Sequence, residues 1–306
     1  MVIKSTLHLL LINFSKIAMK RGRNMELHII HENEEQIMIR KFIEKVQVES
    51  SYKKFLKLDI IEQMINIFKG NYQKSAYPNQ ISNCLELALQ FYKNYNYKFY
   101  KMIVYGIENK KIIISRDVFK PYTDTDNGMT YIRMYGNDGD LFLLVHEFAH
   151  YIDRNFEPKI ISSNLDCLSE VFSFFIEKQL ELWLPKEKYD DLIFARRNNR
   201  IYFESNMLKA VEYELHYEKL FYKNGKIEED EIDIEKIRFI MKYANRDLIN
   251  YLIRYPLANV LSDYLVNMKF NIDKEDLCEK CFQTDLYSVL HEWSNNIGQL
   301  SKRKNK

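Results

Sequence analysis

Residues 141–153 constrain this chain more than any other stretch, because they combine an apolar run with two histidines four positions apart. Residues at that spacing lie on one face of a helix, so the imidazoles of His146 and His150 can share one metal ion. Glu147 is rotated off that face, where its carboxylate can reach a metal-bound water as a general base. This pattern is typical of zinc hydrolases. A core helix with two ordinary histidines is the alternative, and a third ligand would argue against it.

A catalytic zinc ion needs three protein ligands and one open position. Residues 163–183 have the apolar spacing of a second long helix, and Glu170 falls inside its apolar stripe. A carboxylate on an apolar face is costly unless it is paired or bound to a metal. We therefore predict one Zn²⁺ per chain, held by His146, His150 and Glu170. A surface charge or a buried salt bridge at Glu170 is the alternative.

The two segments resemble the active-site helices of the thimet oligopeptidase and oligoendopeptidase F family of zinc peptidases. The first motif is Asp140–His150, and the second runs from Glu170 to Glu177 in the family pattern Glu-x-x-Ser-x-Phe-x-Glu. The resemblance covers about residues 100–270 and suggests a short, divergent member of this gluzincin-type family. It implies a mostly α (α+β), zincin-like fold. A small antiparallel or mixed sheet of about three strands would lie in front of the metal-binding helix, packed in a helical body.

The tyrosine-rich segment of the family is altered in this chain. Family members use a histidine and tyrosines there to stabilise the oxyanion, whereas this chain has no histidine between His216 and His291. Tyr251 and Tyr255 are the candidate donors, because residues four apart lie on one helical face. The chain is also much shorter than family members, so their deep substrate channel is not implied here.

Three further residues are candidates to support the metal ligands. Asp153 follows His150 by three positions and can accept a hydrogen bond from a ligand imidazole; a surface charge at the helix end is the alternative. Glu177 ends the second motif. His216 is a candidate supporting group or replacement oxyanion donor, with a solvent-facing histidine as the alternative.

The segments expected to form strands lie before the metal-binding helix and comprise residues 98–105, 111–115 and 129–135. In the last of them, Thr130, Tyr131, Ile132 and Arg133 alternate in polarity and directly precede that helix. We expect this strand to form the sheet edge along which an extended peptide pairs through its backbone. An ordinary structural strand is the alternative.

The length of 306 residues suits one large or two small domains. We expect an N-terminal helical region over residues 1–96 and a catalytic region over residues 97–306, forming one continuous compact unit. Few glycines and prolines, 8 and 5, favour long helices and short turns.

The charge balance gives no reason to expect a nucleic acid or an anionic membrane as a partner. Lysine and arginine number 45 against 43 acidic residues, a net charge of +2. Four cysteines in a chain this long suggest no disulfide framework, and a reducing, cytoplasmic compartment is the simpler interpretation. The apolar segment 7–14 is short for a signal core and far too short to span a bilayer. The true start is left open between Met1 and Met25.

These features predict a zinc metalloendopeptidase or oligopeptidase that hydrolyses peptides or extended protein segments. Glu147 would act as the general base, and Tyr251 or Tyr255 would donate to the developing oxyanion. The alternative is a catalytically weak or inactive zinc-peptidase fold that binds a peptide or protein without turnover. A helical protein without a metal is a third possibility.

Overall fold

The computed structural model describes residues 37, 39, 42, 57–119, 121–124, 128–155, 168, 170–224, 227, 231–243, 248–272, 277–282 and 284–293. The chain divides into two compact units, residues 1–40 and 41–306, and every element below belongs to the second unit. Residues on both sides of the expected boundary after residue 96 belong to the second unit, and that boundary stays a prediction.

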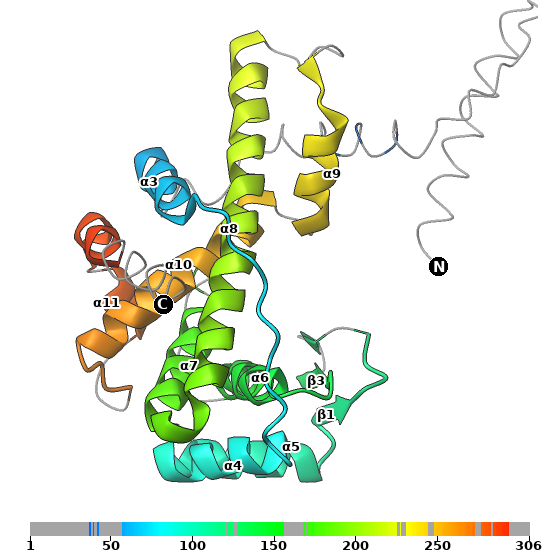
Figure 1. Ribbon diagram of the computed structural model, residues 1–306, viewed down its shortest axis with the longest axis vertical. Helices are drawn as coiled ribbons and strands as arrows, with labels where there is room; N and C mark the ends of the chain where they lie inside the picture. The colour runs from blue at the N-terminus through cyan, green and yellow to red at the C-terminus, as the bar shows by residue number, and fades with distance from the viewer. Residues whose placement is uncertain are drawn as a thin grey trace, which may run out of the picture. The chain divides into compact units, whose positions relative to one another are not determined.

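Helices make up most of the described residues (Figure 1), which confirms the expected helical body. Their bounds are α3 Leu58–Phe68, α4 Cys84–Tyr95, α5 Tyr97–Glu108, α6 Gly139–Asn155, α7 Val171–Trp183, α8 Lys186–Asn224, α9 Ile234–Tyr243, α10 Leu248–Asn267 and α11 Leu277–Phe282. Helix α6 packs on α7, α7 packs on α10, and α10 packs on α8, while α4 and α5 also contact α6. Helix α6 is therefore enclosed by its neighbours, and Leu141, Phe142, Leu144, Val145 and Phe148 on it are fully buried.

The sheet consists of β1 (Ile112–Ser115), β2 (Tyr122–Asp124) and β3 (Met129–Arg133) in the order β1-β3-β2. Strand β3 pairs with β1 in parallel and with β2 antiparallel. Strand β3 is therefore the central strand, and the expectation that it forms a sheet edge is wrong. Its neighbours already occupy the backbone groups that an extended peptide would need.

The segment 98–105, expected to be a strand, is part of helix α5. The Asn96 side chain caps this helix by accepting hydrogen bonds from the backbone N–H groups of Lys98 and Phe99. Phe99, Ile103 and Gly106 are buried along one face at helical spacing. The aromatic and β-branched residues that suggested a strand thus pack as a helical face, since the cap and the contact with α6 outweigh intrinsic preference.

Two buried aspartates fix the start of α6. Asp140 accepts hydrogen bonds from the backbone N–H groups of Tyr135, Gly136 and Asn137. Asp138 accepts from the N–H groups of residues 80 and 81, at distances of 2.7 and 3.1 Å. Both carboxylates lie in the turn that enters the helix, so they hold α6 to the strand before it and to the segment that precedes α4.

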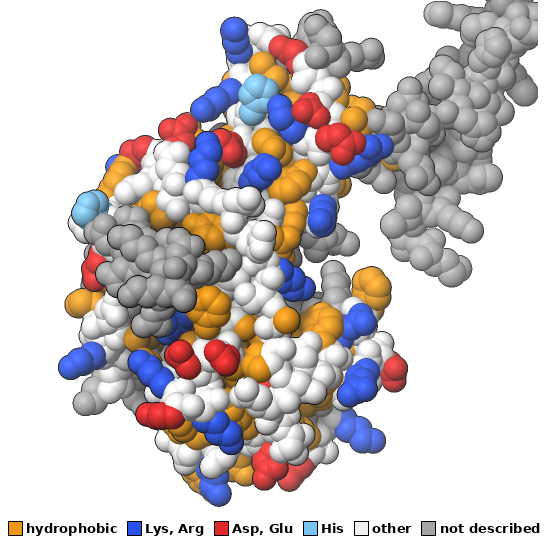
Figure 2. Space-filling model, viewed as in Figure 1, with side chains coloured by type: hydrophobic (Ala, Val, Ile, Leu, Met, Phe, Trp, Pro, Cys, Tyr) orange, Lys and Arg blue, Asp and Glu red, His pale blue; other side chains and the backbone are white. Residues whose placement is uncertain are grey.

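The surface of the described part carries both signs of charge. Lysine and arginine side chains are interspersed with aspartate and glutamate on the face shown in Figure 2. Within the described residues, no helix is both long and apolar enough to cross a membrane.

Candidate metal centre

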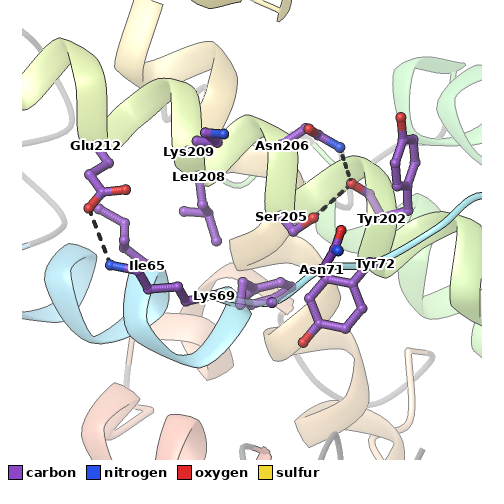
Figure 3. A pocket seen from close by; sticks show the side chains of 12 residues that line it. Ile65, Lys69, Asn71, Tyr72, Tyr202, Ser205, Asn206, Leu208, Lys209 and Glu212 are labelled. Carbon is purple, nitrogen blue, oxygen red and sulfur yellow. Dashed lines mark hydrogen bonds and ion pairs between the residues drawn. The ribbon is translucent and has the colours of Figure 1, made fainter. Parts of the chain in front are cut away.

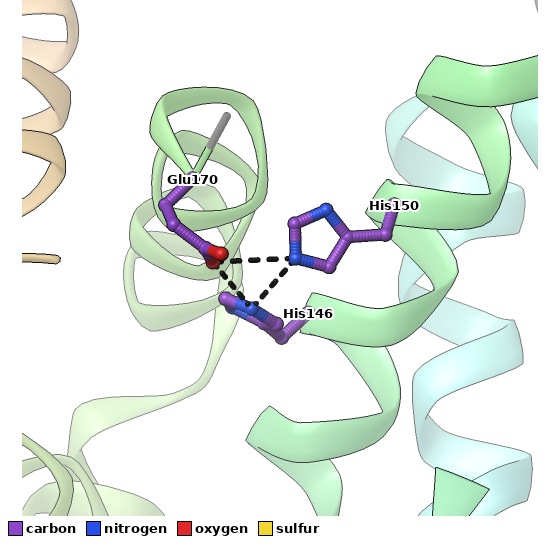
Figure 4. Close-up of side chains that lie close together, drawn as sticks. All are labelled: His146, His150 and Glu170. Atoms are coloured by element: carbon purple, nitrogen blue, oxygen red, sulfur yellow. Dashed lines mark hydrogen bonds and ion pairs between the residues drawn. The ribbon is translucent and has the colours of Figure 1, made fainter. Parts of the chain in front are cut away.

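Three predicted ligands converge at the contact between α6 and α7 (Figure 4). His146 and His150 project from successive turns of α6, and Glu170 reaches them from the residue that precedes α7. These three residues form a group of potential metal-binding side chains whose donor atoms lie within 4.8 Å of one another. The spacing of the sequence motif and the packing of two helices together create this group.

The donor atoms have the separation that a four-coordinate metal ion requires. Glu170 Oε2 lies 3.1 Å from His146 Nε2 and 3.2 Å from His150 Nε2, and the two nitrogens are 3.1 Å apart. Bonds of about 2.0–2.1 Å in tetrahedral zinc place neighbouring donor atoms roughly 3.3 Å apart. Glu170 Oε2 is also buried without a hydrogen bond of good geometry. A buried oxygen of this kind needs a partner, and the two imidazoles and the carboxylate fit zinc.

Glu170 occupies the N-cap position of α7, with φ −96° and ψ −12°, and its side chain makes no capping hydrogen bond. Its carboxylate is left to face α6 from the positive end of the α7 dipole. Burial alone would raise the pKa of Glu170, but His150 and His146 hold it well below its usual range. The ligand therefore stays ionised.

The ring of His146 is oriented by Glu177, one of the predicted supporting residues. Its Nδ1 atom lies 2.7 Å from Glu177 Oε1. Burial alone would raise the pKa of Glu177, but Arg196 and Arg200 hold it well below its usual range. An ionised carboxylate at Nδ1 keeps a proton on that nitrogen, so Nε2 is the nitrogen that would bind a metal ion.

Two arginines that sequence analysis did not identify hold Glu177 in place. Arg196 donates from Nε and Nη2 to Glu177 Oε2 at 2.9 and 2.6 Å, and Arg200 donates from Nη2 at 2.5 Å. Both come from α8 and lie one helical turn apart, so their side chains reach the same carboxylate. That spacing of two arginines was a readable signal, but the sequence does not say which acidic residue they meet.

Glu147 is the candidate general base and is only 8% exposed. Burial raises the pKa of its carboxyl group, and the neighbouring His146 and His150 offset only part of that rise. A carboxylate with a raised pKa accepts a proton more readily near neutral pH. Because it follows His146 directly on α6, it lies beside the ligand group on a rigid helix.

Helix α10 brings Tyr255 to the same region. The ring of Phe174 contacts both His146 and Tyr255. Its centroid lies 5.5 Å from that of the His146 ring and 6.2 Å from that of the Tyr255 ring. Arg254, which sequence analysis also missed, lies 3.4 Å from Glu170 Oε1 and 3.1 Å from the Tyr255 hydroxyl. Tyr251 belongs to α10 as well, but its side chain lies outside what the structure describes.

The other predicted site residues have different positions. Asp153 lies on α6 one turn beyond His150 and is half-buried. His216 is exposed on α8, beside Glu62 and Leu215, and not with the three ligands.

The four predicted substrate-binding residues lie on central strand β3. Thr130 and Ile132 are fully buried and face the core. Tyr131 and Arg133 are half-buried on the other face, and Arg133 donates a hydrogen bond to the Phe119 carbonyl. The alternation along this strand was therefore predicted correctly, and substrate binding by these four residues stays a prediction.

A separate pocket of about 510 Å³ lies between α3 and α8 (Figure 3). Its polar groups pair with one another, since Ser205 and Asn206 donate to the Tyr202 carbonyl and Lys69 pairs with Glu212. None of the metal-centre residues lines it. The pocket is distinct from the metal centre.

No protein-family model and no curated protein matches this chain. The structure is similar to that of a protein provisionally named oligoendopeptidase F, from Bacillus anthracis str. Ames, with 17% sequence identity and a TM-score of 0.48. The match covers 87% of this chain and 54% of that protein, so the chain spans about half of its length. The function proposed below depends on the side chains of the metal centre.

Proposed function

We propose that this chain is a zinc-dependent peptidase that hydrolyses peptide bonds in peptides or extended protein segments. The observation that supports this most is the convergence of His146, His150 and Glu170. Glu147 is buried on α6, the helix that carries the two histidines. Three ligands with a carboxylate base at that place are the arrangement of a metal-assisted hydrolase.

The side chains have separate roles in this proposal. His146, His150 and Glu170 would hold Zn²⁺, which when bound lowers the pKa of a coordinated water towards about 7. Glu147 accepts the proton released as water attacks the scissile carbonyl and passes it to the leaving amine. Tyr255 donates its O–H to the oxygen on which negative charge develops, and Tyr251 remains a second candidate donor.

The substrate would bind in an extended conformation beside the sheet. Strands β1 and β2 are the outer strands, and β2 contacts α6, which favours β2 as the pairing edge. A cytoplasmic location and the absence of nucleic-acid and membrane partners remain predictions from the sequence.

The first experiment compares zinc content by elemental analysis in the parent, in Glu170→Ala and in the control Glu212→Ala. Glu212 is an exposed glutamate on α8 that pairs with Lys69. We expect about one zinc per chain in the parent and the control, and a large loss in Glu170→Ala, since a three-ligand site loses one ligand. A folded parent without zinc would end the peptidase proposal.

The second experiment tests turnover on a quenched peptide library. Glu147→Gln removes the base but none of the ligands, so it should keep its zinc and lose roughly 10²–10⁴-fold in rate. Equal rates in Glu147→Gln and the parent would contradict the proposed mechanism.

The competing function is a zinc-containing module that binds a peptide or protein without cleaving it. The missing histidine in the tyrosine-rich segment favours this alternative, whereas the buried base Glu147 argues against it. A parent that holds zinc and retains peptides but cleaves none of the library would support the binding module.

A further inference from the structure

Arg254 connects a metal ligand to the candidate oxyanion donor. Its Nη2 atom lies 3.4 Å from Glu170 Oε1 and donates a hydrogen bond of 3.1 Å to the Tyr255 hydroxyl oxygen. The same nitrogen makes both contacts. Its guanidinium carbon is 4.9 Å from the centre of the Tyr255 ring, and the side chain is 23% exposed. The Arg254 guanidinium therefore links the candidate ligand Glu170 to Tyr255.

This contact has a consequence for the phenol of Tyr255. When a tyrosine oxygen accepts a hydrogen bond from one side, its own O–H must be directed elsewhere. A cationic donor also polarises the phenol, so the O–H becomes a stronger hydrogen-bond donor to an anion. Arg254 thus controls both the direction and the strength of the Tyr255 hydroxyl.

The ring of Tyr255 contacts two other aromatic rings. Phe174 lies 6.2 Å away and Phe203 lies 6.1 Å away, between ring centroids. Phe174 in turn packs against His146, and the Arg200 guanidinium carbon lies 4.4 Å from the Phe174 ring centre. These ring contacts restrict the phenol, and the hydrogen bond from Arg254 constrains where its hydroxyl proton points.

We infer that Arg254 is a positioning residue for the oxyanion donor: it anchors on Glu170 and directs the Tyr255 hydroxyl toward the reacting carbonyl. This inference rests on the proposed peptidase function. It also explains how the chain could stabilise an oxyanion without a histidine in this segment, since a cation beside the phenol supplies the missing electrostatic contribution.

The test is a double-mutant cycle of Arg254→Gln and Tyr255→Phe on the zinc-loaded protein. We would measure zinc content, kcat and KM on a cleaved peptide, and affinity for a phosphinic peptide, which carries a negative charge where the oxyanion forms. Each single variant should keep its zinc and its KM and lose roughly a hundredfold in kcat and in phosphinic-peptide affinity. The double variant should lose little more than either single variant, because both changes remove the same interaction.

Arg238→Gln serves as the matched control, because Arg238 is an exposed arginine on α9 that pairs with Glu235. Its zinc content, kcat, KM and affinity for the phosphinic peptide should equal those of the parent. If Arg254→Gln does not fold, Arg254→Lys takes its place in the cycle, since it keeps the charge but loses the planar guanidinium that reaches both oxygens. We expect a smaller loss that is again non-additive with Tyr255→Phe.

The inference is overturned if a zinc-loaded Arg254 variant binds the phosphinic peptide as tightly as the parent, or if the two losses are additive. A parent without zinc or turnover is a different outcome, because it contradicts the proposed function itself.

Discussion

At the scale of single residues, the metal centre depends on carboxylates whose ionisation is set by their neighbours. Glu177 is fully buried, yet two arginines keep it charged and the ring of His146 is held by one of its oxygens. Glu204 is fully buried as well, but its direct hydrogen bond comes from the neutral side chain of Asn259. The two residues therefore respond differently to substitution and to pH.

Glu177→Gln should weaken zinc binding by roughly 10–100-fold, because the amide does not hold the proton on His146 Nδ1 as a carboxylate does. Competition with a chromogenic chelator measures the affinity. Glu181→Gln is the matched control, since Glu181 is buried on the same helix and pairs with Arg197. It should bind zinc as the parent does, and an equal loss in both variants would remove Glu177 from the metal centre.

Glu204 should make the protein less stable as the pH rises. Burial raises the pKa of Glu204 to about 8 from 4.5, and Arg200 and Asn259 offset only part of that rise. Lys178 lowers and Asp263 raises the same pKa by smaller amounts. Because the folded state holds this proton more tightly than the unfolded state, the contribution to stability is fully present below pH 4.5. It falls as the pH rises to about 8.

Glu204→Gln should remove this pH dependence, because an amide keeps the hydrogen bond from Asn259 without ionising. Urea unfolding at several pH values between about 5 and 8 measures the difference in unfolding free energy between parent and variant. We expect the variant to gain stability over the parent progressively across that window. A constant difference would contradict the role assigned to Glu204.

Residues that act through local spacing or belong to one of the two motifs were predictable, whereas the arginines that act only through tertiary contact were not. His146, Glu147 and His150 lie within one and a half helical turns, so their shared role follows from helix geometry. Arg196 on α8 contacts the Glu177 carboxylate on α7, and Arg254 on α10 contacts Glu170 at the start of α7. Both contacts depend on how the helices pack. Sequence patterns do not encode these partners.

At the scale of elements, the ends of helices determine structure that composition alone assigns incorrectly. The segment Tyr97–Glu108 has the aromatic and β-branched residues of a strand, but Asn96 begins a helix there. The buried spacing of Phe99 and Ile103 was also compatible with a helix. Both signals are present in the sequence, and in the structure they outweigh the strand preference of these residues.

Asn96→Ala should lower the free energy of unfolding by about 1 kcal/mol, because two backbone N–H groups at the start of α5 lose their acceptor. Urea denaturation measures the change. Asn96→Asp keeps an acceptor oxygen and should restore most of the loss. Equal stability in Asn96→Ala and the parent would mean that the cap does not stabilise α5.

At the scale of the whole molecule, the three candidate ligands lie on α6 and at the start of α7, two helices in the centre of the helical packing. Helix α6 packs on α7, and α7 on α10, so a metal ion held by all three ligands would cross-link the centre of the helical body. The helical content was predictable from periodicity over long segments. The strand order was not, because alternation does not reveal whether a strand has one neighbour or two.

Zinc should therefore stabilise the folded protein. At a free concentration of about 100 times Kd, binding to the folded state alone adds about 2.7 kcal/mol to the free energy of unfolding. Thermal unfolding with zinc and with a chelator measures this as a rise in Tm. Glu170→Ala should show little or no rise. An identical rise in that variant would place the stabilising metal elsewhere.

The short outer strands limit how much affinity a peptide could gain from its backbone. Strand β1 has 4 residues and β2 has 3. Alternate residues of an edge strand direct their N–H and C=O groups outward, so about two residues are available on each edge. At about 0.5–1.5 kcal/mol per hydrogen bond, they supply at most about 6 kcal/mol, whereas a micromolar Kd needs about 8 kcal/mol. Tight binding of a peptide would therefore require its side chains, so peptides of equal length should differ strongly in affinity.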